Sequence, residues 1–326
     1  MSDCRLGFRY PDKRGDTVAS GIEEGFGQRI AAATDVAAVV DACRWLEAEG
    51  RGRVDPQRLR QALPALLHAH LARITDHPAF RLWLDAYFGR RPAAFRSRLQ
   101  QPGYLYYPAL EPRAWFDIDV LPELAPLVPR IPAVRDELLA VLANAGDFSP
   151  YVSAEAARSR TWAGLADRPD WSALHLLRRG EWHRELMARL PLTDAFLAGA
   201  PLAQYPPHAP ECFVSRLKPG VVLPPHHGLS NIKLTVHLPV DLPPTGCDIT
   251  VAGETRIWRD GEFLVFDDSF LHSAANRSDR DRTVMIFDVW HPHLSEDERA
   301  ALAHAIAVLD AVQSAIARLA GPATSS

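Results

Sequence analysis

The sequence predicts an α+β protein: a mainly helical N-terminal region, then a small antiparallel barrel or jelly roll, then a C-terminal helix. Apolar residues recur at helical spacing through about the first hundred of the 326 residues. After Cys212 the spacing changes to two, and short runs rich in Val, Ile, Thr and Phe alternate with turn residues. Six or more such runs within about 90 residues favour a barrel or jelly roll, with the helices packed on its outside.

Helices are expected from Val18 to Leu99 because apolar side chains there fall on one helical face. One run extends from Val36 to Leu46. The next follows Asp55-Pro56, where Asp is a typical N-cap and Pro a typical first helical residue. Further helical stretches are expected at Val134 to Ala145, Trp182 to Leu190 and Ala301 to Ala320, the last as a surface-packed helix.

A composition shift to Pro, Gly and Tyr between Gln101 and Pro112 predicts a boundary. We therefore expect a helical region at 1–100, a second domain at 101–320 with its β core at 212–292, and a frayed tail at 321–326.

The strands are expected to be short and antiparallel. They are predicted at Phe213 to Leu217, Ile232 to Pro239, Asp248 to Val251, Thr255 to Trp258, Phe263 to Phe266 and Thr283 to Trp290. Two segments are predicted as hairpin turns, Ala252-Gly253-Glu254 and Arg259-Asp260-Gly261.

Composition excludes several classes of protein. The formal net charge of -4 offers no basic surface for nucleic acid. Four cysteines, Cys4, Cys43, Cys212 and Cys247, contain no CxxC pair, which argues against a zinc ribbon or disulfide framework and favours a reducing cytoplasm. Neither a secretion signal nor a membrane span is expected. Phosphate-loop, Rossmann, serine-hydrolase and HExxH motifs are absent.

Histidines concentrate in the β region, where five of the 13 fall between Pro225 and Pro292. His226 precedes a predicted strand, and His272 precedes the last one, so a jelly roll would bring both to one mouth. Two imidazoles suit iron, copper, nickel or zinc, and non-haem iron oxygenases add a carboxylate two residues after the first histidine. Here that residue is Gly228. The alternative is that both histidines are ordinary hydrogen-bonded residues.

The run from Ile232 to Leu238 has one apolar face and one polar face, the latter carrying Lys233, Thr235 and His237. The polar face would point to water in a half-buried strand. In a barrel covered by helices it would instead line an internal cavity. The alternation along the strand is compatible with both arrangements.

Several motifs in order resemble the aspartyl/asparaginyl β-hydroxylase family. They are Val214-Ser215-Arg216-Leu217-Lys218-Pro219-Gly220, Pro225-His226-His227-Gly228-Leu229-Ser230-Asn231, Phe266-Asp267-Asp268-Ser269-Phe270-Leu271-His272, Arg282, and Phe287-Asp288-Val289-Trp290-His291-Pro292. The resemblance is strong from about Cys212 to Leu294 and does not include the first hundred residues. It implies a double-stranded β-helix dioxygenase that uses Fe(II), 2-oxoglutarate and dioxygen.

The resemblance also implies roles for individual residues. His226 and His272 correspond to the catalytic iron ligands, and Gly228 to the family's glycine in place of the usual carboxylate. Ser215 and Arg282 correspond to residues that hold the distal carboxylate of 2-oxoglutarate, and His237 to one near its metal end.

Lys233 and Thr235 stand where animal members use two arginines for the substrate acid. This departure from the family pattern leaves the cofactor chemistry in place, and because the Lys233 ammonium can still attract a carboxylate, we expect Lys233 and Thr235 to bind an acidic substrate residue. The resemblance implies β-hydroxylation of an aspartyl or asparaginyl residue, most similar to the group that modifies short peptides such as lanthipeptides. A free or carrier-bound amino acid, an acyl chain, or a non-catalytic peptide-binding module of the same fold are the alternatives. The sequence does not specify the oligomeric state.

Overall fold

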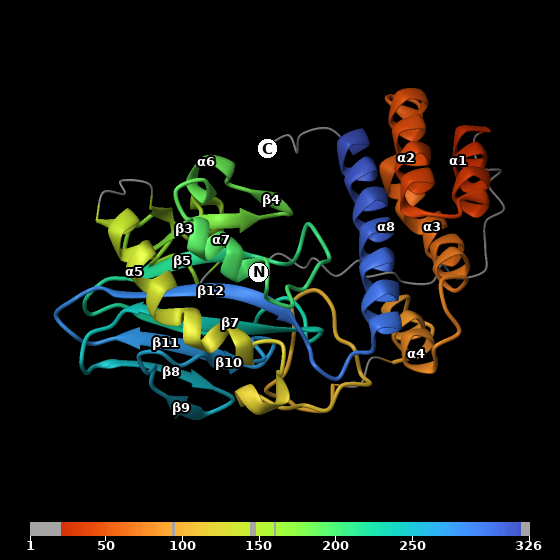
Figure 1. Ribbon diagram of the computed structural model, residues 1–326. Coiled ribbons are helices and arrows are strands. Elements are labelled where there is room, and N and C mark those ends of the chain that lie inside the picture. The colour runs from red at the N-terminus through yellow and green to blue at the C-terminus, as the bar shows by residue number, and fades with distance from the viewer. Residues whose placement is uncertain (1–20, 93–94, 144–147, 160, 321–326) are drawn as a thin grey trace. The chain divides into compact units, whose positions relative to one another are not determined.

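The computed structural model describes residues 21–92, 95–143, 148–159 and 161–320, and it divides into two compact units (Figure 1). One unit is Phe95–Leu294, and the other joins the residues before it to those after it. Cys4, the start of the predicted helical region and the predicted tail at 321–326 lie outside the described residues.

The smaller unit is helical and contains α1 (Gly21–Ala32), α2 (Val36–Gly50), α3 (Pro56–Leu71), α4 (Pro78–Tyr87) and α8 (Glu296–Ala320). The predicted start of α3 is confirmed, since the Asp55 carboxylate accepts a hydrogen bond from the Gln57 amide at 2.9 Å and Pro56 is the first helical residue.

The sequence placed the C-terminal helix in the 101–320 domain, whereas the structure groups α8 with α2, α3 and α4. Its apolar stripe, which includes Leu302, Ile306 and Leu309, is buried, and Arg318 forms an ion pair with Glu47 of α2 at 2.6 Å. By length and composition alone α8 would also be able to cross a membrane, although half of its most apolar window is buried inside the folded protein.

The larger unit contains two antiparallel sheets. The first has the order β1-β10-β7-β12-β5-β3-β2, with β4 paired to β3, and the second has the order β6-β11-β8-β9. The strands are β1 (Trp115–Phe116), β2 (Ser149–Pro150), β3 (Trp171–Arg178), β4 (Glu181–Trp182), β5 (Cys212–Leu217), β6 (Val222–His226), β7 (Lys233–Asp241), β8 (Cys247–Val251), β9 (Glu254–Arg256), β10 (Leu264–Phe266), β11 (His272–Asn276) and β12 (Arg282–Trp290).

From β5 to β12 the chain passes back and forth between β10-β7-β12-β5 and β6-β11-β8-β9. This alternation is the topology of a jelly roll, or double-stranded β-helix, so the predicted fold class is confirmed. The helices and 3₁₀ turns of this unit are η1 (Ile118–Val120), η2 (Ala125–Arg130), α5 (Ile131–Leu142), η3 (Ala154–Arg158), α6 (Arg184–Met187) and α7 (Pro191–Leu197).

Several local predictions need correction. The stretch Trp182 to Leu190 is not one helix, because it holds the end of β4 and the four-residue α6. The Ala252-Gly253 hairpin joins β8 to β9 as expected. The Asp260-Gly261 turn joins strands of different sheets, since β9 pairs with β8 and β10 pairs with β7.

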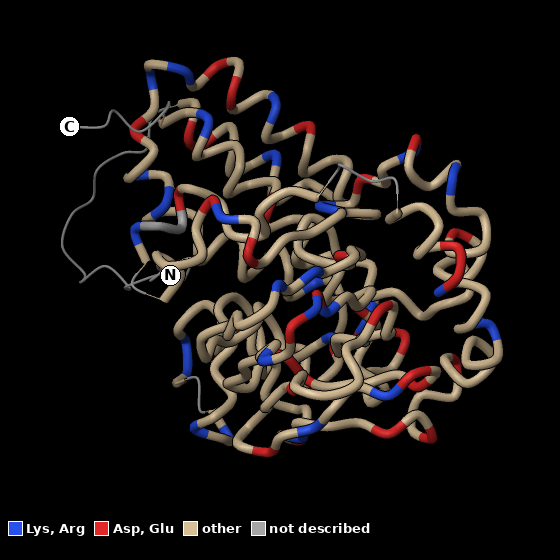
Figure 2. The backbone as a smooth tube through the Cα atoms, turned by 90° about the vertical axis from the view of Figure 1, so that its left-hand side faces the viewer, with Lys and Arg blue, Asp and Glu red and all other residues tan. Residues whose placement is uncertain are grey.

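One apolar cluster, on the outer face of the large sheet, explains the orientation of β7. Leu234, Val236 and Leu238 pack in the cluster that includes side chains of α5 and α7, on the outer face of the large sheet (Figure 1). Because side chains alternate along a strand, Lys233, Thr235 and His237 point into the barrel. The second of the two arrangements of this strand, a polar face that lines a cavity, is therefore correct. Figure 2 shows segments with Lys or Arg and segments with Asp or Glu scattered among longer stretches of other residues.

Candidate active site

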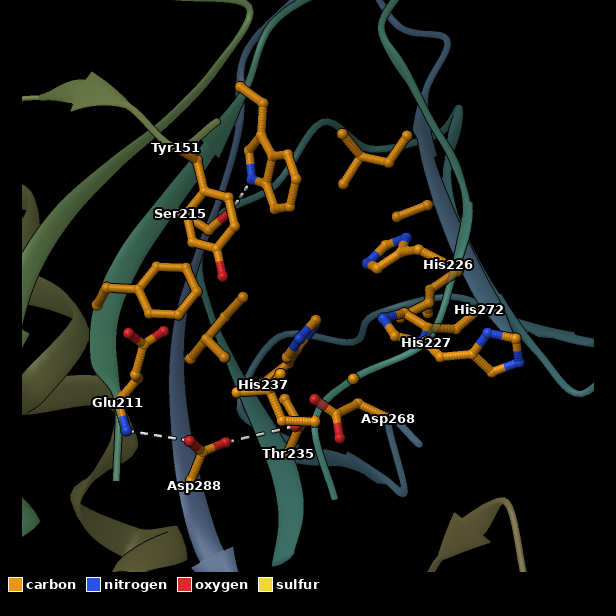
Figure 3. Close-up of a pocket in the computed structure, with 18 of the residues that line it drawn as sticks. Tyr151, Glu211, Ser215, His226, His227, Thr235, His237, Asp268, His272 and Asp288 are labelled. Carbon is orange, nitrogen blue, oxygen red and sulfur yellow. Dashed lines mark hydrogen bonds between the residues drawn. The ribbon is translucent and has the colours of Figure 1, made fainter. Parts of the chain in front are cut away.

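A cavity of about 440 Å³ occupies the barrel interior between the two sheets. All seven site residues that the sequence singled out line it: Ser215, His226, Lys233, Thr235, His237, His272 and Arg282. Figure 3 shows His226 and His272 on one side of this cavity and Glu211 and Tyr151 on the opposite side.

His226 and His272 face each other across two neighbouring strands. They end β6 and begin β11, are direct partners in the antiparallel register, and have ring centroids 4.0 Å apart. The Nδ1 atoms lie 2.8 Å from the Pro224 carbonyl oxygen and 2.9 Å from the Phe270 carbonyl oxygen, respectively. A carbonyl oxygen only accepts, so each Nδ1 carries a proton and each Nε2 keeps its lone pair.

Electrostatics also keeps this pair neutral. Burial, followed by the neighbouring His272 ring, lowers the pKa of His226 to about 3. Burial likewise lowers the pKa of His272, against an opposing effect of the Asp268 carboxylate. Two neutral imidazoles with their Nε2 lone pairs available are the form in which histidine binds a metal ion.

Gly228 leaves room for a carboxylate that comes from elsewhere in the chain. A Cβ atom at this position would overlap the carboxyl group of Asp268. One oxygen of Asp268 binds Lys233, and the other is buried without a hydrogen-bond partner among the described residues. The His272 ring is held through its Nδ1 atom by the Phe270 carbonyl oxygen.

Arg282, at the start of β12, is a buried cation that forms no ion pair with the residues the structure describes. Its side chain is 2% exposed, and its Nε and Nη1 atoms lack hydrogen-bond partners among the described residues. The guanidinium lies 4.8 Å from the centre of the Trp258 ring, and burial lowers its pKa to about 10. Because unpaired buried charge is costly, this site fits a ligand carboxylate.

Ser215 and His237 add two donors to the same cavity. The Trp171 Nε1–H donates to Ser215 Oγ at 3.1 Å, so the serine hydroxyl keeps its own proton to donate. The Trp258 Nε1–H donates to His237 Nδ1 at 3.0 Å, which places the proton of this neutral ring on Nε2. Burial and then Arg282 lower the pKa of His237 well below its usual value.

Lys233 is held by internal partners. Its Nζ donates to Asp288 Oδ1 at 2.7 Å, to Asp268 Oδ2 at 2.9 Å and to Thr235 Oγ1 at 3.1 Å. Although burial lowers the pKa of Lys233, the two carboxylates outweigh it and raise this pKa well above its usual value. An ammonium has three N–H groups. The structure therefore does not support the prediction that Lys233 and Thr235 hold a substrate acid.

The residues fit the groups that the sequence resemblance implies. The two neutral histidines offer a pair of nitrogen donors that a divalent transition-metal ion accepts, while among the described residues no group of three or more His, Cys, Asp or Glu side chains is arranged to hold a metal. The unpaired Arg282 guanidinium, with the Ser215 hydroxyl, suits the distal carboxylate of 2-oxoglutarate.

Sequence reasoning missed Trp171, Trp258, Glu211 and Tyr151 as site residues. The two tryptophans fix proton positions on Ser215 and His237. Trp171 reaches Ser215 from β3, beside β5, and Trp258 reaches His237 from the segment after β9. Glu211 and Tyr151 lie in segments that carry no motif, so no sequence signal pointed to them.

The fold and cavity define a jelly-roll protein with a two-histidine centre. A family model described as "Aspartyl/Asparaginyl beta-hydroxylase" matches residues 130–292, half of the chain. The chain belongs to this family.

Relatives share part of the chain. It is 33% identical over 175 residues to human aspartyl/asparaginyl beta-hydroxylase, covering 52% of this chain and 21% of that protein. It is 33% identical over 224 residues to human aspartate beta-hydroxylase domain-containing protein 1, covering 66% of this chain and 53% of that protein. The chain thus spans about a fifth of the first relative and about half of the second.

Similar solved structures include two at low identity. AviO1 from Streptomyces viridochromogenes has a TM-score of 0.30 and 17% identity over 52% of this chain and 87% of that one. A cupin domain of a transcriptional regulator from Enterobacter cloacae has a TM-score of 0.26 and 11% identity, and the match covers 37% of this chain and 98% of that one.

Proposed function

We propose that the protein is an Fe(II)- and 2-oxoglutarate-dependent hydroxylase that acts on an amino-acid side chain, free or in a short peptide. One observation carries this proposal: the neutral His226–His272 pair shares a cavity with Arg282, a buried guanidinium that pairs with no carboxylate in the part of the chain that the structure describes. Family membership and the jelly-roll topology support the same chemistry.

The residues divide the work as follows. His226 and His272 would hold the metal, with their rings fixed by the carbonyls of Pro224 and Phe270. Arg282 and Ser215 would bind the distal carboxylate of 2-oxoglutarate. The bound metal and co-substrate would supply dioxygen activation, with 2-oxoglutarate converted to succinate and CO₂ while one oxygen enters a substrate C–H bond.

The substrate that family membership suggests first is an aspartyl or asparaginyl residue of a peptide, hydroxylated at the β-carbon. A ribosomally made peptide such as a lanthipeptide belongs to this class of substrate. The opposite wall of the cavity, formed in part by Glu211 and Tyr151, is the surface available to select it (Figure 3).

Two measurements test the proposal. Isothermal titration calorimetry measures 2-oxoglutarate binding to the Zn(II)-loaded protein, and a second assay measures succinate formation by the Fe(II)-loaded protein. His226→Ala and His272→Ala should each abolish both signals while the circular dichroism spectrum stays unchanged. His183→Asn, outside the cavity at the N-cap of α6, is the matched control and should retain both. Normal succinate formation by both alanine variants would exclude this site.

A further inference from the structure

The cavity wall around Lys233 has more negative than positive charge. Asp268 and Asp288 share this single ammonium, at 2.9 and 2.7 Å. Glu211 lines the same wall, and its backbone amide donates to Asp288 Oδ2 at 3.0 Å. Two carboxylates therefore pair with one lysine, and the Glu211 carboxylate is close enough to interact electrostatically with Asp288 and Lys233.

The other buried cation of the cavity lies too far away to balance this charge. Arg282 and Asp288 both belong to β12, six residues apart, which corresponds to about 20 Å along a strand. The guanidinium is also the group assigned to the co-substrate. The excess negative charge near Glu211 is therefore local.

Within the described ranges, the Glu211 carboxylate has one ion-pair partner, and it is a weak one. The Arg178 Nε atom lies 3.9 Å from its carboxylate, and that arginine side chain is 54% exposed. Exposed pairs at such distances contribute little because water screens them. Burial, and then repulsion by Asp288, raises the pKa of Glu211, and these two effects outweigh the opposing attraction of Arg178, Lys233 and Arg179.

Aromatic rings complete this wall. Tyr151 stacks on Trp171 with ring centroids 4.1 Å apart and lies 5.2 Å from the Phe213 ring. All three line the cavity together with Glu211, and Figure 3 shows Glu211 and Tyr151 on the side opposite His226 and His272. Aromatic faces beside a carboxylate form a site for an organic cation.

We propose that the substrate presents an ammonium group to Glu211, across the cavity from the histidine pair. This inference rests on the proposed function and specifies its substrate class. A carboxylate in the same place would meet three acidic groups and a lysine whose N–H groups are already used. The ammonium comes either from a basic side chain or from the free α-amino group of an amino acid or peptide.

The experiment uses full-length protein loaded with Zn(II) and 2-oxoglutarate, and measures probe binding by NMR titration. Acetyl-Lys-Asp-Ala-amide presents a side-chain ammonium and Ala-Asp-Ala-amide an α-ammonium. Acetyl-Ala-Asp-Ala-amide, called the aspartyl probe here, has no ammonium, and all three peptides contain the same aspartyl residue. At least one ammonium probe should bind 10-fold or more tightly than the aspartyl probe. The ammonium probe that binds more tightly shows whether the substrate ammonium is a basic side chain or a free α-amino group.

Glu211→Gln should weaken the preferred ammonium probe by about 10-fold or more, because a charged partner becomes neutral. It should leave 2-oxoglutarate affinity unchanged. Glu181→Gln, an exposed glutamate on β4, is the matched control and should change neither. Tighter binding of the aspartyl probe, or equal ammonium binding by Glu211→Gln, would overturn the inference while 2-oxoglutarate binding persists. Loss of 2-oxoglutarate binding by the wild-type protein would instead refute the proposed function.

Discussion

Two buried cations of the cavity, Arg282 and Lys233, have opposite environments. Lys233 has acceptors for all three of its N–H groups, whereas Arg282 has two nitrogen atoms without partners among the described residues. A buried charge that folding leaves unpaired is stabilised only when a ligand pairs with it. Arg282 is therefore suited to ligand binding, and Lys233 to holding Asp268 and Asp288 in place.

Replacing Arg282 should weaken co-substrate binding specifically. Arg282→Gln removes the charge-assisted hydrogen bonds to a carboxylate, so the dissociation constant for 2-oxoglutarate should rise by roughly 10- to 1,000-fold, at about 1.4 kcal/mol per decade. Calorimetry on the Zn(II)-loaded protein measures this dissociation constant. The exposed Arg259→Gln is the control and should bind normally. An unchanged constant in Arg282→Gln would separate this residue from the co-substrate.

Gly228 should resist substitution for reasons of space. Its φ is not in the left-handed region, but a Cβ atom there would overlap the Asp268 carboxyl group. Gly228→Ala should lower the free energy of unfolding by about 1 to 3 kcal/mol, and Gly228→Asp by at least as much. Gly164→Ala, which has open space around it, is the control. Urea denaturation measures these values.

The same collision predicts non-additivity. In the double variant Gly228→Ala/Asp268→Ala the overlapping atoms are gone, so its destabilisation should be smaller than the sum of the two single changes. Strictly additive values would show that the two side-chain positions do not compete for space. A stable Gly228→Asp with higher activity would likewise oppose the view of a pocket adapted to glycine.

At the scale of secondary structure, β7 could be predicted and the histidine strands could not. The alternation of apolar and polar residues along β7 showed which side chains share each face of the strand. However, β6 contains Pro224 and Pro225, and β11 has the sequence HSAAN, so neither has ordinary strand composition. Their positions before predicted strands placed His226 and His272 at one mouth of a jelly roll, and the family resemblance assigned them as metal ligands. The Lys233–Asp288 contact depends on the register of β7 against β12, which is set by long-range pairing.

The β8–β9 hairpin allows a test of predicted turn chemistry. Ala252 and Gly253 have φ values of 52° and 85°, as a type I′ turn requires, and alanine is strained there. Ala252→Asn should raise the free energy of unfolding by about 0.5 to 1 kcal/mol, measured by urea denaturation. Ala198→Asn, at a residue with φ of -62°, should give no gain. Equal effects at both positions would argue against turn strain.

For the whole molecule, the grouping of α8 with the N-terminal helices makes the two units separable by mutation. Leu302 on α8 and Leu138 on α5 are both buried, in different units. Leu302→Ala should destabilise by about 3 kcal/mol, because it leaves a cavity in a packed core. Hydrogen exchange should then accelerate in α1 to α4 and α8 but not in β5 to β12, and 2-oxoglutarate binding should persist.

Leu138→Ala serves as the reciprocal change and should accelerate exchange in the jelly-roll unit instead. Leu138 packs within the jelly-roll unit, so the cavity that alanine leaves there lowers the free energy of opening of that unit. Faster exchange in β5 to β12 of Leu302→Ala, with the helical unit unaffected, would return α8 to the domain in which the sequence placed it.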